Sequence, residues 1–161
     1  MGPVVLQLNI KGENLNKISL PKKETDIGKV KFDGIEGDFN QFRYSKKKND
    51  PNMAIMILST DILDQLNNEG WPVSPGDLGE NLTIKNINYN SIQPGERYQV
   101  GSVKLEISII CAPCINLKNL SYVGESKIGT FIKTLINRRG WYAKVLKEGY
   151  IQTGDTFECV K

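Results

Sequence analysis

The chain has 161 residues, of which 39% are hydrophobic and 24% are charged, and its net charge is +3. This length and composition predict one globular domain covering 1–161, with a sizeable core. The sequence contains no histidine, which excludes a Ser-His-Asp triad, a Cys-His pair and a histidine-ligated metal. Proton transfer would therefore use carboxylates, lysine, tyrosine, water or a cofactor.

The sequence predicts neither a transmembrane helix nor a secretory signal peptide. No stretch approaches the roughly 18 consecutive apolar residues of a membrane helix. The opening stretch, MGPVVLQLNIKGENL, has no basic region before an apolar core and no small-residue cleavage site. We therefore expect a cytoplasmic protein with reduced thiols and without a membrane partner. An odd number of cysteines, three, also argues against a disulfide framework.

Strand signals dominate the chain. Runs rich in β-branched and aromatic residues predict strands at 4–10, 53–59, 80–87, 97–110, 141–151 and 155–160. Three turns share one form, in which a glycine is followed by an acid and then by a strand: Gly76-Asp77, Gly95-Glu96 and Gly154-Asp155. Glycine at these positions predicts type II turns, because it tolerates the positive φ that such a turn requires.

Two helices interrupt the predicted strands. The first is expected at 60–69, with Ser59 or Thr60 as N-cap and Gly70 as its stop. The second is expected at 127–139, and it has a basic last turn and an apolar stripe of Ile128, Phe131, Ile132, Leu135 and Ile136. The polar segment 36–52 is predicted as a long loop. Many strands, few helices and no alternating βαβ pattern predict a β-barrel with helices packed outside.

The stretch ICAPCI at 110–115 places two cysteines three positions apart, which suggests a redox pair, half of a zinc site or one working thiol. A redox pair would open a helix within a βαβ unit, but INLKNLSYVGES is a poor helix and the βαβ pattern is missing. Three cysteines without histidine cannot complete a zinc site unless a carboxylate or a partner chain contributes. One working thiol fits the sequence best.

The three cysteines differ in their predicted surroundings. Cys111 continues the period-two apolar face of the preceding strand and is predicted to lie in the core, as is Cys159, which alternates with Phe157. Cys114 follows Pro113, beyond the predicted strand end. Proline interrupts regular strand pairing, and loops that leave strands often carry working residues. Cys114 is therefore the candidate reactive thiol.

Five stretches in order carry a family resemblance: FDGIEGDFN (32–40), SPGDLGENLTI (74–84), QPGERYQVGSVKLEIS (93–108), APCINL (112–117) and RRGWYAKVLKEGYIQTGDTFECV (138–160). Together they resemble the MOSC domain, named for the C-terminal domain of molybdenum cofactor sulfurase, in a small stand-alone form. The resemblance implies a β-barrel of the pyruvate kinase barrel-domain type with a few peripheral helices. This agrees with the predicted strands.

The resemblance also implies that the protein binds molybdenum cofactor (molybdopterin). The cysteine that matches the family's PC motif is Cys114, which would be the molybdenum ligand or would accept sulfur from a pyridoxal-phosphate cysteine desulfurase. Thiolate sulfur suits either role. The leading hypothesis is cofactor handling or sulfur transfer, with a desulfurase or a molybdoenzyme as partner. The alternatives are a molybdenum-dependent reductase of N-hydroxylated substrates with an electron-donor protein, and a non-catalytic binding or regulatory barrel.

Further candidate residues come from the same resemblance. Arg138 and Arg139 match a basic segment and are the first choice for binding the cofactor phosphate, with a solvated helix end as the structural alternative. Glu80 and Asn81 match the GEN motif near the family's site. They would contact the pterin or stabilise a turn.

Asp38 and Arg43 are weaker candidates for cofactor binding. Many relatives have histidine near the position of Asp38, where this chain has GDFNQFRYSKKK. Proton transfer by histidine is thus excluded here, which weakens the reductase hypothesis more than cofactor binding. No aromatic platform accompanies the lysines at 46–48, so we expect no nucleic-acid partner.

Overall fold

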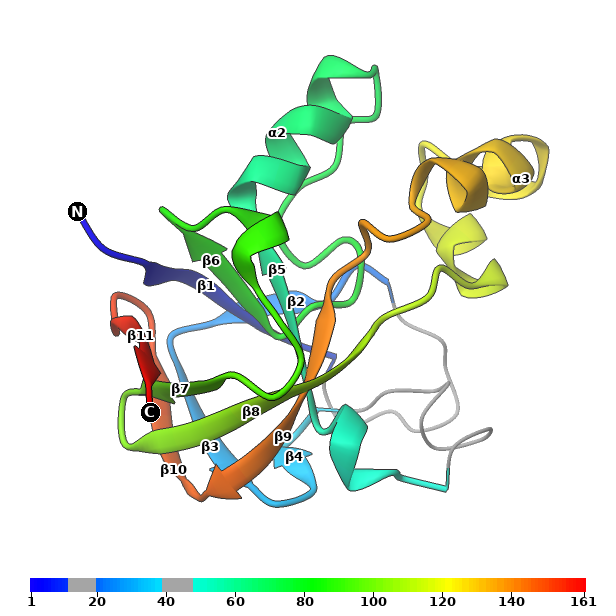
Figure 1. Cartoon of the computed structure of the whole chain (residues 1–161). Helices are drawn as coiled ribbons and strands as arrows, with labels where there is room; N and C mark the ends of the chain where they lie inside the picture. Colours follow the sequence, from blue (N-terminus) through cyan, green and yellow to red (C-terminus); the bar gives the residue numbers. More distant parts are fainter. Residues whose placement is uncertain (12–19, 39–47) are drawn as a thin grey trace.

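The computed structural model describes residues 1–11, 20–38 and 48–161. Within these ranges the protein is mainly β, with two α-helices, α2 (Thr60–Asn68) and α3 (Gly124–Thr134). The strands form a curved body, and both helices lie at one end of it (Figure 1). Short 3-10 helices occur at η1 (Pro51–Met53), η2 (Tyr89–Ser91) and η3 (Ile115–Asn119).

The strands form two sheets. The larger sheet has eight strands in the order β11 (Phe157–Val160), β7 (Arg97–Val100), β8 (Val103–Ile110), β9 (Trp141–Lys147), β5 (Ile55–Ser59), β6 (Leu82–Lys85), β1 (Val4–Ile10) and β2 (Lys23–Thr25). The smaller sheet has the order β10 (Gly149–Gln152), β3 (Ile27–Lys31) and β4 (Gly34–Ile35). Neighbouring strands are antiparallel, except for the parallel pair β5 and β6.

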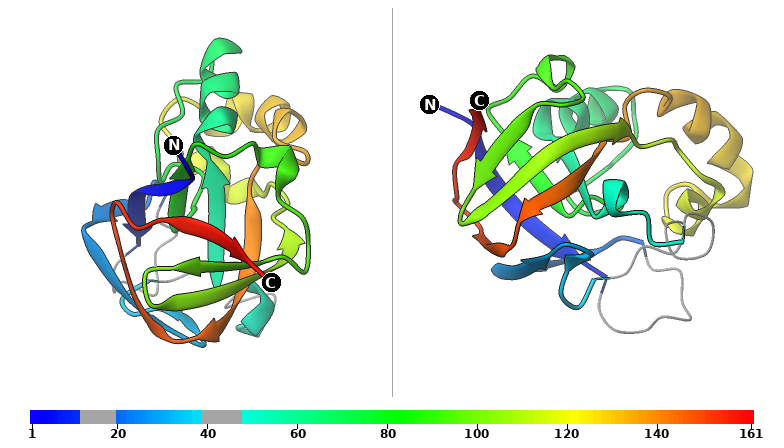
Figure 2. Two further views of the ribbon diagram at one scale, coloured as in Figure 1. Left: turned by 60° about the vertical axis from the view of Figure 1, so that its left-hand side comes forward. Right: turned by 60° about the horizontal axis from the view of Figure 1, so that its bottom comes forward.

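The strand β1, which lies next to the edge strand β2 of the large sheet, approaches the opposite edge at β11. Val4 and Thr156 form an isolated antiparallel bridge. The amide of Phe157 donates to the carbonyl of Pro3 at 2.9 Å, and the amide of Val5 donates to the carbonyl of Asp155 at 2.8 Å. Figure 2 shows β11 beside the start of β1. The described strands therefore curve toward closure through a bridge, without a continuous ladder between β1 and β11.

Two hydrophobic clusters make up most of the core. One lies inside the curved sheet and is built from inward-facing side chains of the strands, such as Leu8, Ile57, Leu105 and Phe157. The other lies between the helices and the loops, and it contains Leu66, Leu78, Leu117 and Phe131. Trp141 packs against both clusters, so the start of β9 joins the sheet to the helical end.

Several sequence predictions are confirmed. The strand 4–10 is β1, and the first helix begins after Ser59, with Gly70 beyond its end at φ +99°. The turn glycines Gly76, Gly95 and Gly154 have φ of +90°, +87° and +92°.

Other predictions are wrong. Cys159 was predicted to lie in the core, but it is exposed on the edge strand β11. The sequence shows no alternating βαβ pattern, yet β5, α2 and the parallel strand β6 form one βαβ unit. The strands β2, β3 and β4 were not predicted, because they are short and mix charged residues and glycine with few apolar residues.

The second helix is shifted from its predicted range. It begins at Gly124 and ends at Thr134. Ile136 therefore lies outside the apolar stripe and is 56% exposed, whereas Ile128 and Phe131 are buried as predicted. The chain turns at Asn137, which has φ +63°, a left-handed conformation that asparagine tolerates better than most residues. Arg138 and Arg139 consequently belong to a turn, not to a helix.

None of the helices in the described ranges has the length and apolar character needed to cross a bilayer. The central part of the predicted 36–52 loop, residues 39–47, lies outside the described residues.

Candidate functional site

The two cysteines of ICAPCI lie in different environments. The amide of Cys111 donates to the carbonyl of Gly140 at 2.8 Å, and its side chain is 1% exposed, as predicted for a core residue. Burial raises the pKa of the Cys111 thiol, despite the nearby Arg139 guanidinium, which lowers it. Cys114 is half-buried and extended, and it precedes η3. Cys114 is thus the accessible thiol of the pair.

Arg139 lies directly beside Cys114. Its Nη1 donates to the Cys114 Sγ at 3.2 Å and to the carbonyl of Ala112 at 3.0 Å. Its Nε and Nη2 donate to the carbonyl of Leu78 at 3.2 and 3.1 Å. One guanidinium therefore connects the 74–81 loop, the cysteine loop and the segment before β9.

The positive charge of Arg139 is buried without a carboxylate partner among the described residues: its hydrogen bonds go only to carbonyl oxygens and the Cys114 sulfur. Burial opposes the charge, but the Cys111 and Cys114 thiols and Tyr142 raise the pKa of Arg139 above its usual value. A buried cation requires a negative partner or several hydrogen bonds. Here hydrogen bonds to loop carbonyls and to the Cys114 sulfur hold the charge.

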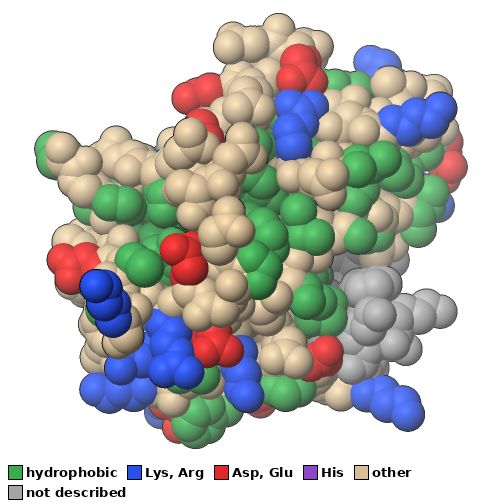
Figure 3. All heavy atoms as spheres, in the orientation of Figure 1, with side chains coloured by type: hydrophobic (Ala, Val, Ile, Leu, Met, Phe, Trp, Pro, Cys, Tyr) green, Lys and Arg blue, Asp and Glu red, His purple; other side chains and the backbone are tan. Residues whose placement is uncertain are grey.

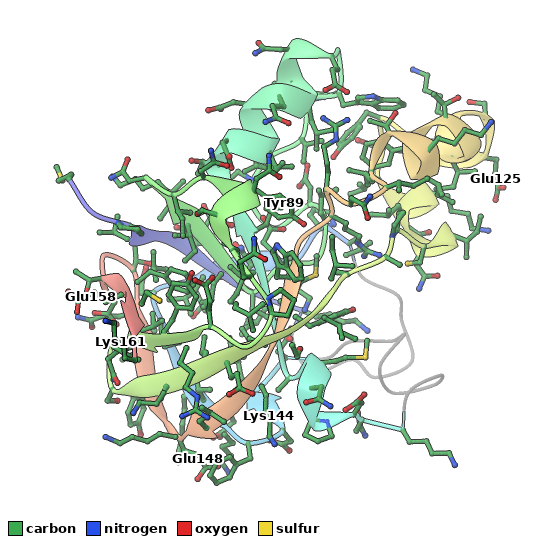
Figure 4. The ribbon with its side chains drawn as sticks, viewed as in Figure 1. Tyr89, Glu125, Lys144, Glu148, Glu158 and Lys161 are labelled. Carbon is green, nitrogen blue, oxygen red and sulfur yellow. The ribbon has the colours of Figure 1, made fainter. Side chains whose placement is uncertain are left out.

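Gly140 fixes the backbone beside this guanidinium. It has φ +132°, and a Cβ atom at this position would lie 2.7 Å from the carbonyl oxygen of Ile57, so only glycine fits. The Gly140 amide donates to the Tyr89 hydroxyl at 3.1 Å. Tyr89 is labelled in Figure 4, where its side chain lies between the strands and the helical end. These contacts set the position from which Arg139 reaches Cys114.

Arg138 has different partners. It donates to both carboxylate oxygens of Glu69, at 2.7 and 2.8 Å, and to the carbonyl of Thr134 at the end of α3. It therefore links α2 to α3 and satisfies a terminal helix carbonyl. The structure brings Arg139, and not Arg138, to the cysteine.

Asp38 lies in a buried polar cluster that the sequence only partly indicated. It accepts hydrogen bonds from Lys22 Nζ at 3.0 Å, Asn81 Nδ2 at 2.8 Å and the Lys11 amide at 2.8 Å. Burial raises the pKa of Asp38, but Lys22 and these donors outweigh it and leave the pKa below its usual value. Lys22 was not among the predicted site residues, because nothing in its local sequence pattern separates it from the exposed Lys23.

The two GEN residues hold the loop. Asn81 uses both side-chain N–H groups, on Asp38 Oδ2 and the carbonyl of Asn9, and its Oδ1 accepts from the Met56 amide at 3.0 Å. Glu80 is fully buried and accepts from Thr83 Oγ1 at 2.9 Å, while its Oε1 has no hydrogen-bond partner among the described residues. Burial raises the pKa of Glu80 to about 7. These contacts agree with the alternative role predicted for Glu80 and Asn81, in which the two residues stabilise a turn.

Two candidate features remain outside this geometry. Arg43 lies outside the described residues. The described residues also contain no group of three or more cysteine, aspartate or glutamate side chains arranged to hold a metal ion.

Comparison with known proteins identifies the class. The MOSC domain model matches residues 44–158, which is most of the chain. The protein therefore belongs to the MOSC domain family, as the sequence resemblance indicated.

Solved structures share the fold. The YUAD protein from Bacillus subtilis superposes with a TM-score of 0.77 at 21% identity, over 96% of this chain and 93% of that one. YiiM from Geobacillus stearothermophilus gives a TM-score of 0.72 at 18% identity, over 99% of this chain and 76% of that one. YiiM from Escherichia coli gives 0.69 at 16% identity, over 100% of this chain and 71% of that one.

One curated relative matches part of the chain. A protein named Reductase from Gibberella moniliformis (strain M3125 / FGSC 7600) is 34% identical over 87 residues. These residues are 53% of this chain, and they span only 15% of the length of that relative.

Proposed function

We propose that this protein binds molybdenum cofactor through Cys114 and acts in cofactor handling or sulfur transfer. The observation that carries the proposal is the contact of Arg139 Nη1 with Cys114 Sγ at 3.2 Å, made by a buried guanidinium without a carboxylate partner among the described residues. A soft sulfur ligand next to a fixed cation suits an anionic metal–dithiolene group.

The remaining candidate residues divide into two roles. Arg139 would neutralise negative charge at the ligand, whereas Asn81, Glu80 and Asp38 would hold the loops that position it. A bound cofactor would supply any redox chemistry, whereas sulfur transfer would use the Cys114 thiolate. Arg138 remains a predicted phosphate ligand, but its pairing with Glu69 favours a structural role.

Sulfur transfer needs only Cys114. Its thiolate would attack the terminal sulfur of a donor cysteine persulfide, such as that of a desulfurase. The donor S–S bond would break, the donor cysteine would leave as a thiolate, and Cys114 would carry the persulfide. Arg139 would stabilise the negative charge on the transferred sulfur, and no net oxidation would occur.

A reductase is the second candidate, and the name of the 34% identical relative favours it. The reaction would reduce N-hydroxylated substrates and would require two electrons from a separate donor protein.

We also propose that the fold is a closed barrel of the pyruvate kinase type. The bridge between Val4 and Thr156 supports this proposal.

The decisive experiment measures bound molybdenum and pterin after expression in a host that makes the cofactor. We expect the wild-type protein and Cys159→Ser to retain both, and Cys114→Ser to lose most of the metal. Equal metal in wild type and Cys114→Ser would refute Cys114 as the ligand. If the wild-type protein bound no metal and also accepted no labelled sulfur from a cysteine desulfurase, the non-catalytic alternative would replace the proposal.

A further inference from the structure

The surface beside Cys114 is apolar and uncharged. Residues 107–117 contain no acidic or basic residue. The chain neighbours of Cys114 form an apolar rim that reaches solvent: Ala112 is exposed, Pro113 is half-buried and Ile115 is 54% exposed. In Figure 3, hydrophobic side chains follow the end of β8 toward η3, whereas Lys and Arg gather over the start of β8. The reactive thiol thus lies in a neutral part of the surface.

The charged residues that flank this stretch are paired. Glu106 Oε2 accepts from Arg97 Nε at 2.9 Å, and Lys118 Nζ lies 3.2 Å from Glu125 Oε1. Each pair is neutral as a unit. The charge that acts directly on the Cys114 sulfur is therefore the buried guanidinium of Arg139.

A molecule that delivers an atom to the Cys114 sulfur meets both features. An atom in contact with Sγ would lie within about 7 Å of Arg139 Nη1, since Nη1 is 3.2 Å from Sγ. At this distance the guanidinium attracts an anion and repels a cation. The rest of the molecule would extend over the apolar rim, which favours an uncharged, apolar body.

We propose that Cys114 accepts sulfur from small organic thiosulfonates, which are anions in which an apolar body carries an –SO₂–S⁻ group. This inference rests on the sulfur-transfer role proposed above and names the class of donor. The terminal sulfur would contact Sγ near Arg139, and the apolar body would lie on Ala112, Pro113 and Ile115.

The transfer needs no further reactant. The Cys114 thiolate would attack the terminal sulfur of the donor, a new S–S bond would form, and the S–SO₂ bond would break. The electron pair of the broken bond would leave with the sulfinate, and the transferred sulfur would keep its negative charge as the Cys114 persulfide. Two anions must approach each other in this step, and the positive charge of Arg139 would lower their repulsion.

The test compares benzenethiosulfonate with methanethiosulfonate, which carry the same reactive group on different bodies. Peptide mass spectrometry after alkylation measures the rate of persulfide formation at Cys114, and each rate is divided by the rate for free cysteine. The normalised rate should be about fivefold higher for the benzene donor, because its ring contacts the apolar rim. Ile115→Ser should abolish this advantage. Ile27→Ser, a change at the 53% exposed residue that begins β3, should retain it.

The charge is tested separately. Arg139→Met should slow both anionic donors about tenfold relative to the neutral reagent methyl methanethiosulfonate, and it should leave the advantage of the benzene donor unchanged. The two isoleucine changes are on the surface, so the test of the apolar rim does not depend on the folding of Arg139→Met. Far-UV circular dichroism would verify the fold of each variant.

Two results would overturn this inference: equal normalised rates for the two donors in the wild-type protein, and a benzene advantage that survives Ile115→Ser. Free cysteine persulfide, as a third donor, separates these results from a failure of the proposed function. If Cys114 accepts sulfur from cysteine persulfide but does not distinguish the thiosulfonates, only the donor class is wrong. If Cys114 accepts sulfur from none of the three donors, the sulfur-transfer role is wrong and the donor class with it.

Discussion

The two accessible thiols of this protein have different surroundings. Cys114 lies beside the buried guanidinium of Arg139, at 3.2 Å from its Nη1, whereas Cys159 is exposed on the edge strand β11, in an open groove that Glu96 and Glu158 also line. The guanidinium is fixed by hydrogen bonds to loop carbonyls, whereas Glu158 is exposed to solvent. A fixed buried charge acts on its neighbour more strongly than an exposed and screened one, so the two thiols should differ in their reactivity.

The largest effect on this difference between the two thiols is expected for Arg139→Met. The change removes the buried charge and leaves the carbonyls of Leu78 and Ala112 without their donors, so we expect a loss of about 3 kcal/mol in unfolding free energy. It should also abolish a preference of about tenfold for an anionic over a cationic methanethiosulfonate at Cys114. Urea denaturation and labelling kinetics measure both effects. An unchanged labelling preference would show that Arg139 does not control the field at the thiol.

The next largest effect concerns pH and should be confined to the Cys114 end of the molecule. Burial raises the pKa of Glu80 from 4.5 to about 7, so the unfolded chain releases this proton at lower pH than the folded protein. Stability from the protonated carboxyl is therefore complete below about pH 4.5 and is lost as pH rises through 7.

Glu80→Gln should remove this pH dependence, which amounts to about 2–3 kcal/mol between pH 4.5 and 7.5. Urea denaturation at both pH values would measure it. Asp38 acts in the opposite direction, since its lowered pKa removes stability only as pH falls below its usual titration range. Parallel pH profiles for wild type and Glu80→Gln would contradict the assignment.

A smaller effect is expected at Cys159, which lines an open groove together with Glu96 and Glu158. The double change Glu96→Gln and Glu158→Gln should lower the preference of Cys159 for a cationic over an anionic methanethiosulfonate by several-fold, about fivefold in dilute buffer. Added salt should reduce the wild-type preference in the same way, because these charges are exposed. Competitive labelling with the two reagents gives the ratio directly. A salt-independent ratio would argue against an electrostatic origin.

The smallest effect is expected for Arg138→Ala. This change removes the pairing with Glu69 and the contact with the Thr134 carbonyl, so thermal stability should fall less than in Arg139→Met. The labelling preference at Cys114 should not change. If it changed as much as in Arg139→Met, the two arginines would share a role at the thiol.

The sequence predicted much of the framework because local chemistry determined it. Alternating apolar residues defined β1, and glycine followed by an acid defined the turns at Gly76, Gly95 and Gly154. The placement of Cys111 and the separate position of Cys114 also followed from strand periodicity and Pro113. These signals depend on neighbours in the chain, which the sequence displays directly.

The remaining features depend on contacts between distant segments. Arg138 and Arg139 are adjacent and chemically identical, yet the turn at Asn137 directs one to Glu69 and the other to Cys114. Lys22 is buried only because Asp38 meets it across the fold. Cys159 is exposed because its strand lies at a sheet edge, which its alternation with Phe157 could not indicate.

The hydrogen bonds of Arg139 have a consequence for local unfolding. One side chain joins the 74–81 loop, the cysteine loop and the entry to β9, so opening any of these segments breaks hydrogen bonds to Arg139 and weakens the restraint on the other two. Amide hydrogens at Cys111, Gly140 and Asn81 should then exchange with solvent as one cooperative unit. An anion that binds Arg139 would slow hydrogen exchange in all three segments together. Slower exchange in one loop would therefore report that the anion occupies the site that the three segments form.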